Sequence, residues 1–283
     1  MNQIILAPGR EKSVLQRHPW IFSGAVETVT GSPQSGETVD VISSKGEWLC
    51  SAAYSPVSQI RARIWSWNKE ETIDEEFFER QIIKSIERRE KLGLFNQSDA
   101  IRLVHGESDG LPGLVADCYG DTIVLQILSA GMERWKIQAA QIIQSRQQAK
   151  RVIERSDVEV RKLEGLPEST GMMFGDRPSG EITINENGLR FLVDVLQGQK
   201  TGFYLDQREN RKLAGTLLHG KRALNCFSYT GGFTIHALAS GAEEVISIDS
   251  SNEALETGRR NLQLNDLAVH RATWLDADVF QAL

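Results

Sequence analysis

The residues best placed to do chemistry lie in one stretch near the C-terminal end, ALNCFSYTGGFTIHALASGAEEVISIDSS. A strand pattern over Arg222–Phe227 runs into the turn SYTGG, and a helical pattern follows it through Ala239. A glycine-containing turn of this kind lets a ligand approach the backbone and presents the first N–H groups of the helix to it. Asp249 ends the next strand pattern, where an acid can accept both hydroxyls of a ribose. Asp278 follows a third strand pattern and could accept from an adenine amino group.

These positions together describe a ligand that contains adenosine. Turns that hold the pyrophosphate of NAD favour the pattern G-x-G-x-x-G. The turn NCFSYTGG has only Gly231 and Gly232, and it has no basic partner. The turn therefore favours a ligand without phosphate, S-adenosylmethionine (SAM). The alternative, that the two glycines only allow a strand and a helix to pack closely, stays open.

The elements that would position these residues form a strand–helix–strand pattern from about Gly198. The predicted strands are Arg222–Phe227, Glu244–Asp249 and Arg271–Leu275, with helices between them that end at Ala239 and span Asn252–Asn265. This order predicts the first half of a doubly wound parallel sheet.

The chain before Gly198 has two other patterns. Residues 1–72 contain short strand-like runs separated by turns, which is typical of a small barrel. A helix is expected from Thr72 or Asp74 to about Gly93, with an apolar stripe at helical spacing. Residues 100–197 alternate as an α+β domain, with a helix over Glu133–Arg146 and strands near Leu114–Ala116, Thr122–Leu128, Arg151–Arg155, Glu159–Leu163 and Glu181–Val195. Asn187-Gly188 divides the last run and predicts a hairpin.

Composition excludes some classes of protein. The chain has 283 residues and a net charge of −6, so it would bind a nucleic acid only through a local basic patch. No apolar run approaches the roughly 18 residues that a membrane span needs, and we expect no signal peptide. The three cysteines are far apart and have no metal-ligand spacing, which favours a cytoplasmic location and no metal site.

Six segments, one of them within the stretch quoted above, carry a resemblance to a known family. They are APGREKSVLQRHPWIFSGAV, AYSPVSQIRARIW, RLVHGESDGLPGLVADCYGD, ERSDVEVRKLEGLPE, LQGQKTGFYLDQRENR and LNCFSYTGGFTIHALASGA. The chain resembles the class I SAM-dependent 23S rRNA methyltransferases with an N-terminal PUA domain, and most of all the type that makes 5-methylcytosine. The resemblance implies a PUA RNA-binding β-barrel at 1–72, a central EEHEE α+β domain at 73–197, and the N-terminal half of a Rossmann-like SAM methyltransferase domain at 198–283.

The resemblance also implies which residues bind SAM. They are Asn225, Phe227, Ser228, Thr230 and Gly231 in the turn, Asp249, Ser250 and Asp278 at strand ends, and Lys200, Thr201, Phe203, Asp206, Gln207 and Arg208 in the preceding motif. Asp206 suits the ammonium of the methionine part, and Arg208 suits its carboxylate. An ion pair of Arg208 with Asp206 or Glu209 is the structural alternative.

The implied partner is 23S rRNA, with no membrane, and a homodimer is allowed. PUA domains hold RNA with a basic surface edged by aromatic residues. The residues expected to contact RNA are Arg10, Lys12, Arg17, His18, Arg61 and Arg63. Arg61 and Arg63 are two apart in a strand and would share one face. Trp20 is expected in the core of the barrel.

The catalytic residues of the family have no counterpart here. Methylation at carbon 5 of cytosine needs a thiolate that attacks carbon 6 and a base that removes the proton. The family's catalytic cysteine and its DPP-type loop are expected beyond Leu283, so the 283-residue chain is expected to be inactive as it stands. Cys50, Cys118 and Cys226 are expected to be structural. In the family's strand order, 3-2-1-4-5-7-6, the strand Arg222–Phe227 would then have an open edge.

Two other functions remain open at this point. A dinucleotide-dependent oxidoreductase would need the G-x-G-x-x-G turn, which is missing. A non-catalytic RNA-binding protein with a SAM site would share every motif that is present.

Overall fold

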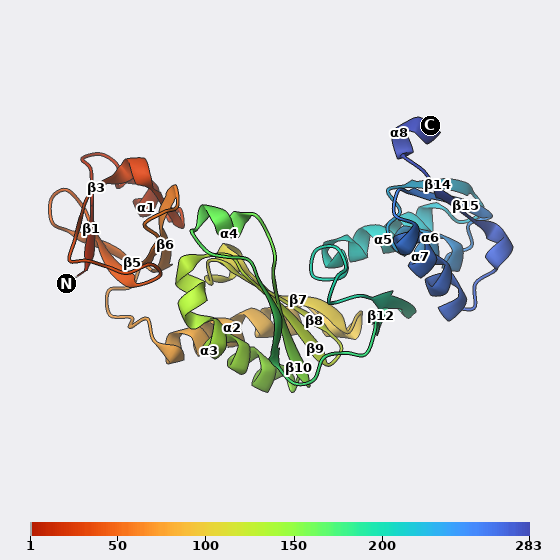
Figure 1. The fold of residues 1–283 in the computed structure, drawn as a ribbon, viewed down its shortest axis with the longest axis horizontal. Coiled ribbons are helices and arrows are strands. Elements are labelled where there is room, and N and C mark those ends of the chain that lie inside the picture. The colour runs from red at the N-terminus through yellow and green to blue at the C-terminus, as the bar shows by residue number, and fades with distance from the viewer. Residues whose placement is uncertain (1) are drawn as a thin grey trace. The chain divides into compact units, whose positions relative to one another are not determined.

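The computed structural model describes residues 2–283, which divide into two compact units (Figure 1). Unit 1 comprises residues 2–93 and 102–177, and unit 2 comprises residues 94–101 and 178–283. Unit 2 is therefore discontinuous in sequence. The boundaries after residues 72 and 197 are a different division of the chain and stay a prediction.

The N-terminal part of unit 1 is one six-stranded curled sheet. Its strands are β1 (Gln3–Leu6), β2 (Trp20–Phe22), β3 (Val26–Thr30), β4 (Thr38–Ile42), β5 (Trp48–Tyr54) and β6 (Ile60–Ser66), in the spatial order β2-β6-β5-β4-β1-β3. The short helix α1 (Lys12–Leu15) follows β1. Alternate residues such as Ile4, Leu6, Val41 and Ile64 point into one buried apolar cluster, which is the period of two that a half-buried strand requires.

A second sheet of five strands completes unit 1. Its strands are β7 (Ala100–His105), β8 (Leu114–Tyr119), β9 (Thr122–Ile127), β10 (Arg151–Ser156) and β11 (Ser169–Phe174), in the order β11-β10-β9-β8-β7. The helices α2 (Glu75–Lys91) and α3 (Ala130–Gln147) pack side by side along it (Figure 1). Asp74 caps α2 as predicted, because its carboxylate accepts from the Phe77 N–H at 3.0 Å.

The predicted strand over Glu159–Leu163 is wrong. Most of this segment is the short helix α4 (Val160–Leu163), and β11 is the strand that pairs with β10. The physical reason is Arg161, whose side chain is fully buried. Its guanidinium donates to the carbonyls of Ile127 and Pro167, each at 2.6 Å. A helical turn brings this one side chain into reach of both acceptors, and the local sequence pattern carries no sign of them.

Unit 2 contains the predicted parallel sheet. Its strands β14 (Arg222–Cys226), β15 (Glu244–Asp249) and β16 (Ala272–Asp276) lie in the order β14-β15-β16, and both pairs are parallel. The helices are α5 (Arg208–Leu217), α6 (Gly232–Ala239), α7 (Asn252–Leu264) and α8 (Val279–Ala282). The predicted strands and the two predicted helices are confirmed within about two residues. Within residues 2–283, β14 pairs with one strand, β15, which agrees with the 3-2-1 order.

A β-hairpin packs against this sheet's helices. Its strands β12 (Ile182–Glu186) and β13 (Leu189–Val193) meet at Asn187-Gly188, and both turn residues have positive φ, 52° and 83°. The predicted hairpin is confirmed. Residues 94–101 belong to unit 2 because Ser98 forms a bridge with Glu186 at the end of β12. The Asp99 N–H also donates to the Asn185 carbonyl at 3.2 Å.

Short 3₁₀ helices connect several of these elements. They are η1 (Ser23–Ala25), η2 (Leu94–Asn96), η3 (Gly106–Asp109), η4 (Leu205–Gln207) and η5 (Val269–Arg271). Within residues 2–283, none of the helices has the length and apolar character needed to cross a bilayer. The same residues contain no cluster of His, Cys, Asp and Glu that could hold a metal ion.

Candidate functional site

The turn between β14 and α6 has a strained backbone. Phe227 and Tyr229 have positive φ values of 56° and 48°, in the left-handed region that such residues rarely adopt. Gly231 follows with φ of 76°, and a Cβ there would come within 2.6 Å of the Trp274 ring. Only glycine fits this position. Strain of this kind concentrates at functional sites, where the surrounding structure maintains it.

Two hydroxyls in the turn are buried without a partner. The side-chain oxygens of Ser228 and Thr230 are inaccessible to solvent, and neither makes a hydrogen bond with any residue in the described part of the chain. A buried polar group without a partner is rare because it costs free energy. Both residues were predicted from the sequence to bind a cofactor, and both hydroxyls could accept or donate a hydrogen bond.

Asp249 holds the ends of all three strands together. Its carboxylate accepts from the Tyr229 N–H at 2.8 Å and from the Ser251 N–H at 3.0 Å. Its backbone carbonyl accepts from the Ala277 N–H at 3.1 Å, directly after β16. The predicted ribose acid therefore lies beside the turn after β14, at the carboxyl edge of the parallel sheet.

The other residues predicted at the strand ends differ in their surroundings. Ser250 is exposed directly after Asp249. Asp278 caps α8, because its carboxylate accepts from the Gln281 N–H at 3.0 Å. Asn225 lies within β14 and donates to the Thr234 hydroxyl at 2.9 Å. Phe227 is 63% exposed, and its ring contacts that of Phe280.

The predicted motif before α5 divides into buried and exposed members. Thr201 and Phe203 are buried, and Phe203 packs between the ring of Phe191 and the guanidinium of Arg211. Lys200 has a positive φ of 59°, and its ammonium lies over the ring of Tyr204. In the exposed part, Gln207 donates to Asp206 at 3.0 Å.

Arg208 forms an ion pair with Glu209, which the sequence left open as the alternative to a contact with the ligand. Its guanidinium donates to the Glu209 carboxylate at 3.1 Å, and its side chain is largely buried. A contact between Arg208 and a ligand carboxylate stays a prediction.

Tyr229 joins the motif before α5 to the turn after β14, and the sequence prediction missed it. Its hydroxyl donates to the Gly202 carbonyl at 3.2 Å and accepts from the Gln199 N–H at 3.1 Å. Its ring meets that of Tyr204 edge to face. The two predicted cofactor-binding segments are therefore adjacent in space. The signal in the sequence was the position of Tyr229 within a turn that holds five predicted cofactor-binding residues.

A buried ionic cluster packs against the segment before α5. Arg211 donates to both oxygens of Glu186 at 2.7 and 2.6 Å, and His236 lies 3.1 Å from the same carboxylate. Burial alone would raise the pKa of Glu186, but the hydrogen bonds from His236 and Arg211 outweigh it and hold the pKa below its usual value. Arg211 also donates to the Tyr204 carbonyl at 2.9 Å, so the cluster fixes the backbone just before α5.

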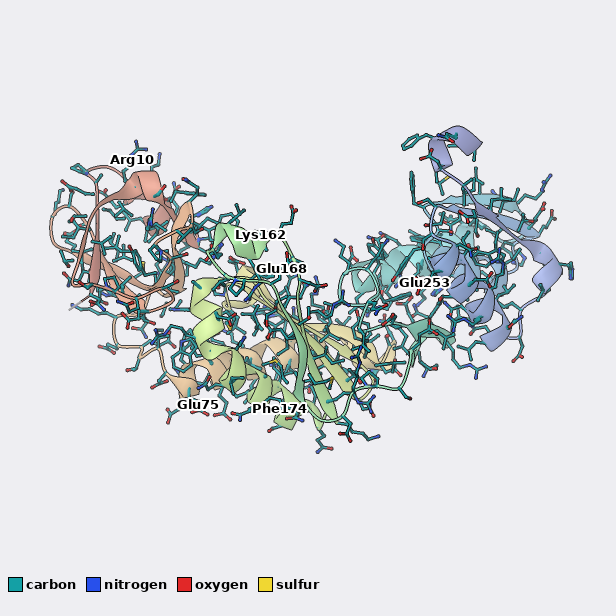
Figure 2. All side chains as sticks on the ribbon, viewed as in Figure 1. Arg10, Glu75, Lys162, Glu168, Phe174 and Glu253 are labelled. Atoms are coloured by element: carbon teal, nitrogen blue, oxygen red, sulfur yellow. The ribbon has the colours of Figure 1, made fainter. Side chains whose placement is uncertain are left out.

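The residues predicted to contact RNA lie in unit 1. Arg10, Lys12, Arg17 and His18 are exposed. The guanidinium of Arg17 lies 5.3 Å from the ring centroid of Trp67. Arg61 is half-buried and donates to the backbone carbonyls of Ser55 and Pro56. Figure 2 shows the labelled Arg10 side chain at the surface of the N-terminal sheet.

Arg63 is the exception, and its geometry argues against the predicted RNA contact. Its side chain is 9% exposed, and its guanidinium pairs with Glu164 at 2.8 Å and with Glu107 at 3.4 Å. Both carboxylates belong to the central part of unit 1. Arg63 therefore serves to connect the N-terminal sheet to this part, and its buried charge is already compensated.

Trp20 is likewise only partly the core residue that the sequence predicted. Its side chain is half-buried, and its indole N–H donates to the Glu107 carboxylate at 2.7 Å.

Two family models match the chain, one near its N-terminus and one over its C-terminal part. A model of PUA-like domains matches residues 4–67. A model of S-adenosylmethionine-dependent methyltransferases matches residues 133–283, which is more than half of the chain. The chain belongs to this methyltransferase family. Its cofactor is SAM, and its fold is a PUA-like domain followed by a Rossmann-like methyltransferase sheet, as the sequence predicted.

Curated relatives support the assignment over nearly the whole chain. Proteins named Ribosomal RNA large subunit methyltransferase I from Erwinia tasmaniensis and Aeromonas salmonicida are each 48% identical to it. The alignments cover 99% of this chain and 71% of each relative.

Solved structures show the same fold. A protein from Streptococcus mutans, assigned as a SAM-dependent methyltransferase, superposes with a TM-score of 0.84 and 21% identity over 100% of this chain and 72% of its own. A second one, assigned as a methyltransferase and crystallised with S-adenosylhomocysteine (SAH), gives a TM-score of 0.85 at 21% identity. It covers 100% of this chain and 71% of its own.

The methyltransferase turn fits the cofactor of its family. SAM carries ribose hydroxyls and a charged amino acid part, so it needs donors and acceptors that are not already used. The buried hydroxyls of Ser228 and Thr230 are such groups. Asp249 keeps acceptor capacity beyond its two backbone bonds, because a carboxylate has about four lone-pair sites.

Proposed function

We propose that this methyltransferase binds SAM between the turn after β14 and the segment before α5, and that it methylates carbon 5 of a cytosine in 23S rRNA. The observation that carries the cofactor part is the pair of buried hydroxyls, Ser228 and Thr230, beside Asp249. The rRNA part rests on the names of relatives that are 48% identical to the chain. The choice of carbon 5 rests on the resemblance of the motifs.

In this proposal each residue has a separate task. Asp249 accepts from the ribose hydroxyls while it keeps its bonds to the Tyr229 and Ser251 N–H groups. Ser228 and Thr230 supply hydroxyls at the base of the site. Asp206 faces the ammonium of the methionine part, as its charge allows. SAM supplies the methyl group.

The chemistry at carbon 5 constrains the choice of nucleophile. A thiolate must add to carbon 6 of cytosine before carbon 5 takes the methyl group, and a base must then remove the proton from carbon 5. Cys50 does not suit this task, because burial and the nearby Asp40 carboxylate raise the pKa of its thiol. Cys118 is buried within β8 and bonded to the Gly120 carbonyl. We assign neither as the nucleophile.

Thr230→Val tests the cofactor site. Valine has the same shape but lacks the hydroxyl, so we expect SAH to bind about two- to tenfold more weakly, as measured by calorimetry. Thr216→Val is the matched control, because Thr216 is exposed on α5 and its hydroxyl donates to the Lys212 carbonyl. If Thr230→Val stabilised the fold and left SAH affinity unchanged, the hydroxyl would have no role in binding.

Asp249→Ala tests the ribose contact. Loss of hydrogen bonds to a charged group costs about 1.5–3 kcal/mol, so SAH affinity should fall at least tenfold. Equal calorimetric affinity of the two proteins would contradict the assignment.

The substrate is tested separately, by nucleoside mass spectrometry of 23S rRNA after incubation with labelled SAM. Label in 5-methylcytidine supports the proposal and contradicts the expected inactivity of the 283-residue chain, and label in another nucleoside contradicts the choice of carbon 5.

A further inference from the structure

Asn261 is a polar side chain on the buried face of α7. It is fully buried, and the same face carries the buried residues Ala254, Leu255 and Leu262. An apolar residue is the usual occupant of such a position. A buried amide costs free energy unless its donors and acceptors are used. What Asn261 contributes must therefore come from its hydrogen bonds.

The Asn261 amide reaches two different parts of unit 2. Its oxygen accepts from the Leu192 N–H of β13 at 2.8 Å, and its NH2 group donates to the Thr230 carbonyl at 3.0 Å. The two partners fix which amide atom is which, because a backbone N–H only donates and a carbonyl only accepts. Asn261 thus connects the hairpin of β12 and β13 to the turn after β14.

The turn lies directly against α7 at this point. A Cβ added at Gly231 would lie 3.5 Å from the Cα of Gly258, three residues before Asn261. The peptide between Thr230 and Gly231 is held at both of its polar atoms. Its carbonyl accepts from Asn261, and its N–H donates to the Ser228 carbonyl at 2.9 Å. Asn261 therefore holds the backbone of the residue whose buried hydroxyl has no partner.

We propose that Asn261 is a positioning residue for the cofactor, which fixes the Thr230 carbonyl and thereby holds the turn in the conformation that binds SAM. The inference rests on the SAM site proposed above, and it adds a residue that acts through the backbone of the turn. Tyr229 has positive φ in this turn, and strained backbone relaxes when its neighbours release it. SAM would then bind only the fraction of molecules with an ordered turn, and its apparent affinity would fall by that fraction.

Asn265 provides a matched comparison at the C-terminal end of the same helix. Its amide accepts from the Arg190 N–H at 2.8 Å and donates to the Arg190 carbonyl at 2.7 Å. It also donates to the Asn261 carbonyl at 2.8 Å. Both asparagines therefore hold β13, but of the two side chains only that of Asn261 bonds to the turn within residues 2–283.

Calorimetry with SAH compares Asn261→Leu with Asn265→Leu. Leucine has nearly the shape of asparagine and no hydrogen-bonding group. Both variants should unfold at a lower urea concentration than wild type, because each leaves backbone groups of β13 without their partner. Asn261→Leu should bind SAH about two- to tenfold more weakly, as the loss of one hydrogen bond to the turn requires. Asn265→Leu should keep the wild-type affinity.

A nuclear magnetic resonance signal reports the contact itself. In protein with ¹³C in the threonine carbonyls and ¹⁵N in the glycines, the Thr230–Gly231 peptide gives a signal that Thr230→Val identifies by its loss. This signal should shift in Asn261→Leu and stay in place in Asn265→Leu. A residue that only stabilised the fold would not move it selectively. If Asn261→Leu does not fold, Asn261→Ala and Asn265→Ala give the same comparison, because alanine favours the helix.

Two results would overturn the inference. One is equal SAH affinity of Asn261→Leu and wild type, and the other is an equal loss of affinity in Asn265→Leu. Absence of SAH binding by the wild-type chain would contradict the proposed cofactor site instead. That outcome is distinct from a wild-type chain that binds SAH without depending on Asn261.

Discussion

Tyr229 links the loop before α5 to the turn after β14. Its hydroxyl bonds to the backbone of Gln199 and Gly202, and its N–H bonds to Asp249. The loops that it joins contain three non-glycine residues with positive φ, Lys200, Phe227 and Tyr229 itself. A strained backbone relaxes unless its neighbours oppose the change. Tyr229 is thus a positioning residue that holds the predicted cofactor-binding backbone ready.

Tyr229→Phe should weaken SAH binding several-fold, because it removes two hydrogen bonds, each worth about 0.5–1.5 kcal/mol. Calorimetry measures the affinity, and hydrogen exchange of residues 197–204 should rise in the free protein. Tyr204→Phe is the control, since the Tyr204 hydroxyl bonds only to the exposed Gln199 side chain, at 2.6 Å. Slower or unchanged exchange of residues 197–204 in Tyr229→Phe would contradict the role.

Gly258 illustrates how closely α7 approaches β16. A Cβ at this position would lie 2.5 Å from the Trp274 ring, which also meets Gly231 in the turn. We expect Gly258→Ala to lower the free energy of unfolding by about 1–3 kcal/mol, because it overpacks the interior. Gly180→Ala is the matched control, since no atom lies within 4 Å of its added Cβ. Urea denaturation compares the two, and equal stability would mean that Trp274 moves freely.

Among the elements of unit 2, Glu186 connects three. It ends β12, and it bonds to Arg211 of α5 and His236 of α6. Its pKa is lowered in the folded state, so it contributes stability that is fully present above the unfolded glutamate pKa of about 4.3. That stability is lost as the pH falls through the lower folded pKa.

Glu186→Gln should therefore be less stable at pH 7, by about 3–5 kcal/mol, because Arg211 loses its buried counter-charge. The same variant should lose less additional stability than wild type between pH 5 and pH 3. Chemical denaturation across this range measures both effects. Glu209→Gln is the control, because Glu209 is exposed and its partner Arg208 is not part of the cluster. A parallel loss of stability with pH in wild type and Glu186→Gln would show that the carboxylate does not titrate as described.

The elements that the sequence predicted well are those with local signals. The hairpin at Asn187-Gly188 and the parallel strands β14, β15 and β16 follow from turn residues and apolar periodicity. The elements that it missed depend on distant contacts. No strand was predicted over Trp20–Phe22, where β2 is held through Trp20 by Glu107. The predicted strand over Glu159–Leu163 was wrong, because α4 forms around the buried Arg161. Neither contact can be read from neighbouring residues.

The candidate site shows the same division. Asp249 and the glycine turn could be predicted because a strand end and a turn identify them in the sequence. Phe203 matches the family motif, yet it is buried between Phe191 and Arg211, where it packs against the interior. Arg63 has the spacing of a phosphate contact, but its partners lie 44 and 101 residues away in the chain. Charge and period alone do not reveal a buried partner.

At the scale of the whole molecule, the predicted cofactor site lies entirely within unit 2. A ligand that binds only the folded state stabilises the part that it contacts, by about 2.7 kcal/mol at 100 times its Kd. Saturating SAH should therefore slow hydrogen exchange in β14, β15 and the turn between them. Exchange in α2 and α3 of unit 1 should change little. Equal protection of both units by SAH would show that they unfold together, and no protection of β14 would contradict the site.

The cytoplasmic location and the homodimer are predictions that none of these observations tests. Sedimentation of the purified chain with and without SAH would test the second.

Because unit 2 is discontinuous in sequence, its two parts leave the ribosome at different times. Residues 94–101 leave the ribosome some 80 residues before β12, their partner at Glu186. At about 5–20 residues per second, this segment waits on the order of ten seconds for its pairing strand. During that time β8 to β11 and α3 of unit 1 are synthesised on its C-terminal side. The nascent chain must keep Leu94–Ile101 available while it finishes another unit, so the order of translation favours completing unit 1 before unit 2.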